Sequence, residues 1–109
     1  MRRGDVYLVR RPAAQDSKRQ RPFVIVSRQV LNDSKYATVI CAPVYSSDAG
    51  LASQVPIGPA EGLKHPSAIH CDGLVSLSKS ALIDYVGSLS AAKLDQLGDA
   101  LRVALGVEG

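Results

Sequence analysis

The sequence predicts a mainly β domain, a small curled β-barrel capped by a C-terminal helix. Many short apolar runs are separated by turn residues, and one segment with helical periodicity closes the chain. At 109 residues the chain is long enough for one hydrophobic core and short for two. We therefore expect residues 1–109 to form a single domain.

Short apolar runs rich in β-branched and aromatic residues mark the expected strands. In order they are residues 6–9, 22–27, 36–45, 54–57, 67–70, 74–77 and 82–89. Polar loops at 11–20 and 46–53 and a turn signal with a short helical turn within 28–35 lie between the first four. Pro43, near the end of the third strand, places that end at a sheet edge or a bulge, because proline cannot donate a ladder hydrogen bond.

The second expected strand carries four uninterrupted apolar side chains, from Phe23 to Val26. A short run of this kind, with a proline only at its head, indicates a strand covered on both faces. Pro22 biases Arg21 towards an extended backbone, which fixes an arginine at the lip of the strand. A guanidinium is always charged and its planar fork matches phosphate oxygens, so Arg21 is a candidate anion ligand. The plain alternative is a solvated surface arginine.

The last segment predicts an amphipathic helix over residues 91–105. Ser90 is a good N-cap, and Gly106 suits the left-handed residue after the helix. The apolar residues that recur at helical spacing are Ala91, Leu94, Leu97, Leu101, Ala104 and Leu105. We expect this stripe to pack on the sheet.

Composition favours a globular domain, with 46% hydrophobic and 21% charged residues. No apolar run approaches the length of a membrane span, and no signal peptide opens the chain, so we expect a cytoplasmic protein without a membrane partner. Cys41 and Cys71 are not closely spaced, and Cys41 lies within an apolar strand, so buried free thiols are expected. We expect neither a metal site nor a cofactor, because no P-loop, dinucleotide fingerprint or paired-histidine zinc motif is present.

The charge is distributed unevenly along the chain. Residues 1–21 carry seven basic and two acidic side chains, whereas the remainder carries six basic and eight acidic ones. A basic end on a mildly acidic body indicates a polyanion-binding face, with nucleic acid the commonest partner of this kind. A basic terminus kept for solubility explains the charge equally well.

Chemistry in this sequence is concentrated in arginine and hydroxyl groups. His65 and His70 are the two histidines; they allow acid–base cleavage of RNA, but a structural or surface role is favoured for both. In metal-free RNA cleavage a 2′-hydroxyl attacks the neighbouring phosphorus, and an arginine aimed at the phosphoryl oxygens stabilises the developing charge. Hydroxyls at Tyr45, Ser46 and Ser47 are candidates to orient the phosphate. Asp16 is a candidate base or partner for the arginine, or a solvated charge.

These residues lead to a resemblance that covers nearly the whole chain. The stretches that carry it are residues 3–7 (Arg-Gly-Asp-Val-Tyr), Arg21-Pro22 with the apolar strand, residues 38–44 (Thr-Val-Ile-Cys-Ala-Pro-Val), residues 74–79 (Leu-Val-Ser-Leu-Ser-Lys), residues 86–89 (Val-Gly-Ser-Leu) and the leucine-rich helix. In this order and spacing they resemble the PemK/MazF family of toxin–antitoxin toxins. The resemblance implies an SH3-like barrel of the CcdB/MazF type and metal-independent endoribonuclease activity on single-stranded RNA. It also implies a homodimer, a cognate antitoxin that threads an acidic segment over the RNA site, and operator DNA bound together with that antitoxin.

The resemblance also assigns site residues. In the family an arginine precedes the proline of the second strand and an acidic residue lies five positions earlier; Arg21 and Asp16 match these positions. A threonine usually ends the third strand, but here Tyr45 stands in its place and is followed by Ser46. Three interpretations follow, in this order: Ser46 takes over the role of the threonine, Tyr45 donates the proton, or activity is weakened.

Further residues are expected to contact RNA. They are Arg10, Arg11, Lys18, Arg19, Ser47 and Asp72. The basic members would follow the phosphate backbone and make binding salt-dependent. Asp72 is the one residue retained from the acidic-glutamine pair and following basic residue of the family.

Two other functions remain open from the sequence. The first is a catalytically degenerate barrel of the same family that binds RNA, DNA or an antitoxin. Gyrase poisoning of the CcdB type is disfavoured, because it uses a C-terminal tryptophan and this chain has no tryptophan. The second is a plain structural partner whose helix and strand edges mediate assembly, which would have no affinity for RNA at low salt.

Overall fold

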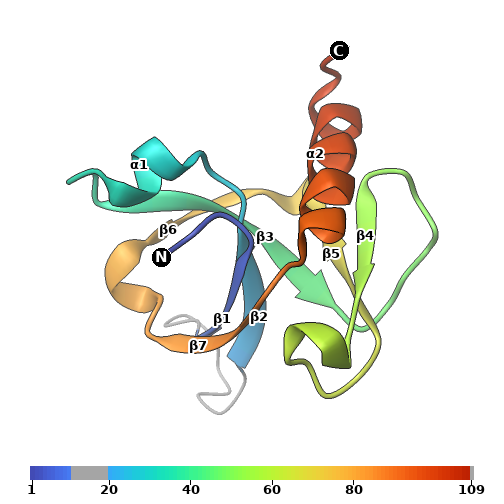
Figure 1. Ribbon diagram of the computed structural model, residues 1–109, viewed down its shortest axis with the longest axis horizontal. Coiled ribbons are helices and arrows are strands. Elements are labelled where there is room, and N and C mark those ends of the chain that lie inside the picture. Colours follow the sequence, from blue (N-terminus) through green and yellow to red (C-terminus); the bar gives the residue numbers. More distant parts are fainter. Residues whose placement is uncertain (11–19, 109) are drawn as a thin grey trace.

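The structure is a computed structural model that describes residues 1–10 and 20–108, and it has the expected strand-rich architecture (Figure 1). Its elements are β1 (Asp5–Arg10), β2 (Gln20–Ile25), α1 (Gln29–Asp33), β3 (Thr38–Tyr45), β4 (Gln54–Ile57), η1 (Pro59–Glu61), β5 (Ser67–His70), η2 (Cys71–Gly73), β6 (Val75–Ser78), η3 (Lys79–Ala81), β7 (Asp84–Ser88) and α2 (Ala91–Leu105). The bounds of β4, β5 and α2 equal the predicted ranges. The other strands agree within two residues, and α1 occupies the predicted turn region.

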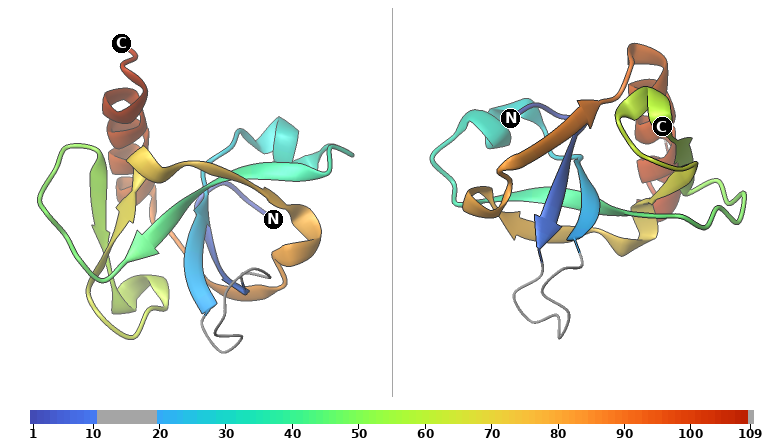
Figure 2. Two further views of the ribbon diagram at one scale, coloured as in Figure 1. Left: turned by 180° about the vertical axis from the view of Figure 1, so that it is seen from behind. Right: turned by 90° about the horizontal axis from the view of Figure 1, so that it is seen from below.

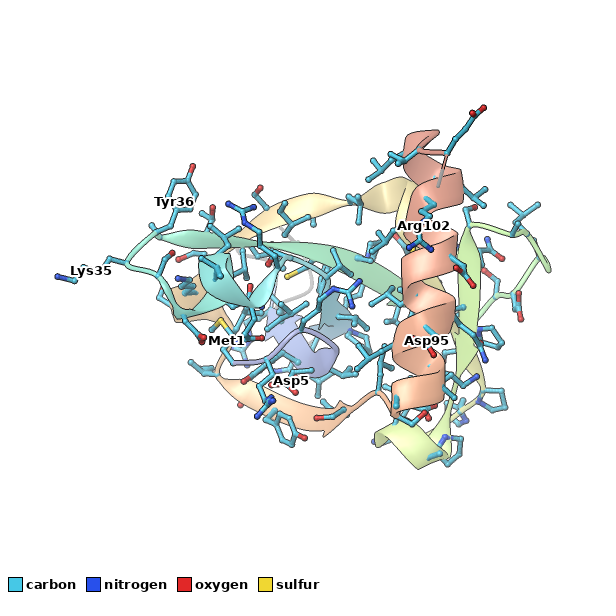
Figure 3. All side chains as sticks on the ribbon, turned by 45° about the horizontal axis from the view of Figure 1, so that its top comes forward. Met1, Asp5, Lys35, Tyr36, Asp95 and Arg102 are labelled. Carbon is cyan, nitrogen blue, oxygen red and sulfur yellow. The ribbon has the colours of Figure 1, made fainter. Side chains whose placement is uncertain are left out.

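The strands pair antiparallel in the order β4-β5-β3-β2-β1-β7, and β6 pairs with β3 off this path. The resulting sheet is strongly curved, with β7 turning back along β1 (Figure 2). The molecule is therefore a half-barrel with a C-terminal helix beside it. Lys35 and Tyr36 project from the turn between α1 and β3, away from the body (Figure 3).

Strand β3 is the centre of the sheet and changes partner along its length. Residues 38–41 pair with β6, residues 44 and 45 pair with β5, and residues 41–43 pair with β2 on the other side. Pro43 is buried opposite Phe23, at the point where β6 gives way to β5. The prediction that this proline marks a sheet edge or a bulge is wrong, because β3 has neighbouring strands on both sides. A proline fits here since β3 changes partner from β6 to β5 at this point, which already interrupts the ladder of hydrogen bonds.

The core forms on both faces of β2, as predicted. Val24 and Val26 belong to a cluster that packs against α2, whereas Phe23 and Ile25 belong to a second cluster that packs against residues of β6 and η3. All four side chains are at most 7% exposed. Successive side chains of a strand point to opposite faces, so an uninterrupted apolar run fits a strand buried on both sides.

Helix α2 has the predicted caps and most of the predicted packing. The Ser90 hydroxyl accepts a hydrogen bond from the Lys93 backbone N–H, and Gly106 adopts the left-handed conformation at φ 68°. Leu97 and Ala100 are buried against the sheet, but Leu105, the last member of the predicted stripe, is 61% exposed. The C-terminal end of the helix projects beyond the sheet (Figure 1), but Ala104 in its last turn is still partly buried against the core. Neither helix among the described residues is long and apolar enough to cross a membrane.

Candidate active site

The start of β2 and the end of β3 bring Arg21 and Tyr45 together. Phe23 pairs with Pro43, and continuing this register places Arg21 opposite Tyr45. The Arg21 guanidinium lies over the Tyr45 ring, 4.1 Å from its centroid, and Nη1 donates a hydrogen bond to the Val44 carbonyl at 3.3 Å. A cation over the face of an aromatic ring is attracted by the quadrupole of the ring, so this contact holds the guanidinium in place.

Arg21 keeps its charge available on this surface. Its side chain is half-buried, and within residues 1–10 and 20–108 it contacts a carbonyl and a ring rather than a carboxylate. A guanidinium has five N–H donors, of which the Val44 carbonyl uses one. Among the described residues, the remaining donors are therefore open to an anion.

The Tyr45 ring also contacts the ring of His70, the last residue of β5. The two rings meet edge to face, with centroids 4.8 Å apart and an interplanar angle of 73°. His70 Nε2 lies 3.0 Å from the Ser47 carbonyl oxygen, and Nδ1 lies 3.4 Å from Gln54 Nε2. His70 thus connects the predicted catalytic tyrosine to the loop that follows it.

Sequence reasoning gave His70 a structural or surface role and did not place it at this site. The two strands that contain Gln54 and His70 could have placed these residues side by side. Residues 54–57 and 67–70 were both predicted with correct bounds, and pairing them as a hairpin sets Gln54 opposite His70, as observed. The sequence did not reveal that β5 also pairs with the end of β3, where Tyr45 lies opposite Ala68.

Ser46 and Ser47 are exposed immediately after β3. Ser46 lines an open cavity of about 570 Å³ together with Gln20 and Pro22, the two chain neighbours of Arg21. The residues that line this cavity do not include Arg21 or Tyr45. The remaining lining residues are Leu8, Gly62, Leu63, Lys64, His65, Ser67 and Val86.

Of the other predicted site residues, the structure describes Arg10 and Asp72. Asp16, Arg11, Lys18 and Arg19 lie outside the described residues. Arg10 is exposed at the end of β1, where it pairs with Gln20. Asp72 is exposed in η2, and its Oδ2 accepts a hydrogen bond of 2.7 Å from the Ser53 hydroxyl.

Both cysteines are buried and free. Burial raises the pKa of the Cys41 thiol to about 12, and burial together with the charge of Asp72 raises the pKa of Cys71 to about 11. A thiol with such a pKa is protonated at neutral pH and is a poor nucleophile. Among the described residues no three histidine, cysteine, aspartate or glutamate side chains gather in a way that could hold a metal ion.

Comparison of the sequence with known protein families identifies one family over nearly the whole chain. Residues 2–105 match the family described as PemK-like, MazF-like toxin of type II toxin-antitoxin system. The chain belongs to this family. The resemblance inferred from the sequence motifs is therefore confirmed.

Individual PemK/MazF relatives are similar over most of their length. Endoribonuclease MazF3 of Mycobacterium tuberculosis is 30% identical over 81% of this chain and 84% of its own. The probable endoribonuclease MazF of Mycolicibacterium smegmatis is 30% identical over 100% of both chains. A mycobacterial endoribonuclease solved in complex with its cognate antitoxin superposes with a TM-score of 0.84 at 26% identity, covering 100% of this chain and 98% of its own. The half-barrel thus has the CcdB/MazF fold that the sequence predicted.

Proposed function

We propose that this PemK/MazF-family chain is a toxin endoribonuclease that cleaves single-stranded RNA without a metal ion. The 2′-hydroxyl of the substrate attacks the adjacent phosphorus, the P–O5′ bond breaks, and the products carry a 2′,3′-cyclic phosphate and a 5′-hydroxyl. The observation that carries the proposal is the Arg21 guanidinium held over the Tyr45 ring, at the strand end that Ser46 directly follows. The names of its relatives support the same activity.

Arg21 stabilises the transition state in this proposal. Negative charge builds on the phosphoryl oxygens as the 2′-oxygen attacks, and charge-assisted N–H donors already in position stabilise that charge without reorganising. The ring of Tyr45 and the carbonyl of Val44 supply this preorganisation, because they hold the side chain from two directions.

The proton for the leaving 5′-oxygen comes from a hydroxyl at the end of β3. Ser46 is the first candidate, because it is exposed and directly follows Tyr45, the residue that contacts Arg21. Tyr45 is the second, since it occupies the position of the family threonine. Asp16 assists as a base or as a partner for Arg21.

Basic side chains of the N-terminal part of the sequence are proposed to guide the RNA backbone. Arg10, Arg11, Lys18 and Arg19 are proposed to contact phosphates, with Ser47 and Asp72 contributing polar contacts. Neutralising phosphates releases counterions, so we expect affinity for RNA to fall steeply with salt concentration. The cavity lined by Ser46 and Lys64 gives room for one nucleotide of the bound strand.

The toxin is proposed to act as a homodimer in the cytoplasm, neutralised by a cognate antitoxin and bound with it to operator DNA. The fold comparison supports the antitoxin, because one solved structure of similar fold is an endoribonuclease in complex with its cognate antitoxin. An acidic segment of the antitoxin would compete with RNA for Arg21.

The test is cleavage of a long unstructured RNA in EDTA by wild type, Arg21→Ala and Arg102→Ala. Arg102 is a matched control, because it is exposed on α2 and pairs only with Asp99 on the same helix among the described residues. Losing one preorganised donor to the transition state typically slows a reaction by about 100- to 1,000-fold. We expect Arg21→Ala to lose activity by this factor with an unchanged circular dichroism spectrum, and Arg102→Ala to cut normally. Cleavage by Arg21→Ala at the wild-type rate would show that the assignment is wrong.

A degenerate binding barrel is the second candidate, favoured by Tyr45 in the place of the family threonine. The same experiment separates the two functions. A wild-type protein that binds RNA at low salt but releases no fragment ending in cyclic phosphate is a binding module and not a nuclease.

A further inference from the structure

Resting on the function proposed above, we propose that His70 is a positioning residue for RNA cleavage. In its neutral form with the proton on Nε2, it holds the Tyr45 ring and the segment after β3 in the geometry that Arg21 and Ser46 require. His70 itself does not touch the reacting atoms.

The contacts of His70 select one tautomer. The Ser47 carbonyl oxygen, 3.0 Å from Nε2, can only accept a hydrogen bond, so Nε2 carries the proton. Gln54 Nε2, 3.4 Å from Nδ1, can only donate, so Nδ1 is the unprotonated acceptor. Both contacts are satisfied together by the neutral Nε2–H form and by no other form of the ring.

The orientation of the Gln54 amide is fixed independently. Its Oε1 accepts a hydrogen bond of 2.9 Å from the Ala49 backbone N–H, which directs the NH₂ group towards His70. The chain of hydrogen bonds therefore starts at Ala49, passes through Gln54 and His70, and ends at Ser47. It clamps the loop of residues 46–53 at two points onto the paired ends of β4 and β5.

The clamp bears directly on the proposed catalytic groups. Ser46 lies between Tyr45, which meets the His70 ring edge to face, and Ser47, whose carbonyl accepts from His70. The other contact of the Tyr45 ring is the Arg21 guanidinium. The His70 ring thus restrains Tyr45 and Ser47, the two chain neighbours of Ser46. Tyr45 is also the ring over which the Arg21 guanidinium lies. A misplacement of about 1 Å can slow a reaction by about 100-fold, so loosening this restraint should reduce catalysis more than binding.

Three substitutions separate the parts of this role. His70→Phe keeps the ring edge against Tyr45 and removes both hydrogen bonds. His70→Gln removes the ring and keeps an N–H donor for the Ser47 carbonyl. His70→Ala removes both. We expect kcat for RNA cleavage to fall about 100-fold in His70→Ala and at least tenfold in His70→Phe, with partial rescue in His70→Gln and KM within about threefold throughout.

A control variant with lowered stability tests whether the loss of kcat comes from His70 itself or from a general loss of stability. Leu101→Ala removes partly buried packing of α2 on the core without touching the site. It should lower the unfolding temperature yet leave kcat unchanged under folded conditions. A ¹⁵N-edited NMR spectrum of the wild-type imidazole provides a readout independent of RNA and should show protonated Nε2 and unprotonated Nδ1.

The outcomes are distinguishable. An inactive wild-type protein would overturn the proposed nuclease function, and the positioning role with it. An active wild type with unchanged kcat in His70→Ala and His70→Phe would overturn the positioning role alone. The Nδ1–H tautomer in the spectrum, or a loss of kcat in Leu101→Ala equal to that in the His70 variants, would overturn it as well.

Discussion

Replacing Tyr45 by phenylalanine and by alanine separates the ring of this residue from its hydroxyl. Among the described residues, the ring contacts the Arg21 guanidinium at 4.1 Å and the His70 ring at 4.8 Å between centroids. Phenylalanine keeps both contacts and removes only the hydroxyl, whereas alanine removes everything. The two variants therefore test the packing role and the proton-donor role of the same side chain.

The magnitude follows from the two contacts. A partly exposed cation–π contact is worth about 0.5–1 kcal/mol, and an edge-to-face aromatic pair about 0.5–1.5 kcal/mol. Tyr45→Ala should therefore lower the free energy of unfolding by about 1–2.5 kcal/mol. Tyr45→Phe should stay within about 0.5 kcal/mol of wild type, as surface substitutions that keep packing usually do.

The assay is urea unfolding followed by circular dichroism, paired with RNA cleavage on the same preparations. With Ser46 as the proton donor, Tyr45→Phe should cleave within about threefold of wild type, because arginine positioning depends on the ring. A stable but inactive Tyr45→Phe would make Tyr45 the donor and reverse our order of candidates. A Tyr45→Ala variant as stable as wild type would refute the energetic reasoning about the cluster.

Three further predictions concern the scaffold and its buried thiols. A Cβ at Gly87 would collide with the Glu61 carbonyl where β7 passes η1, so Gly87→Ala should cost about 1–3 kcal/mol of unfolding free energy in urea; Gly98→Ala, in α2 with open space around it, should gain up to about 1 kcal/mol. Because burial raises the thiol pKa values of Cys41 and Cys71 from 9.0 to about 12 and about 11, neither thiol should react with Ellman's reagent at pH 8 until the protein unfolds. The stability that these protonated thiols contribute is complete below pH 9.0 and is lost as the pH rises towards 11–12, which pH-dependent unfolding would detect.

The sequence was most informative where local rules decide the structure. Ser90 and Gly106 delimit α2 because capping depends on residues within one turn of the helix end. The run from Phe23 to Val26 identified a strand buried on both faces because side-chain alternation needs no knowledge of neighbours. These features follow from chain geometry alone.

Long-range pairing decided what the sequence did not reveal. Pro43 looked like an edge residue because its strand was considered alone, but β3 has β2 on one side and two successive partners on the other. The contacts of His70, for which the sequence favoured a structural or surface role, depend on the same kind of pairing. Strand β5 pairs at once with β4, which supplies Gln54, and with β3, which supplies Tyr45.

The departure at Tyr45 has a physical explanation in these pairings. A tyrosine at the position of a threonine adds a large aromatic ring, which must be packed if it is not to disturb the catalytic groups. Here the face of that ring carries the Arg21 guanidinium, and the ring also meets the edge-to-face imidazole of His70. The imidazole is in turn held by Gln54. Restoring threonine alone would therefore leave His70 without its aromatic partner and Arg21 without its platform, so the change should weaken the site rather than repair it.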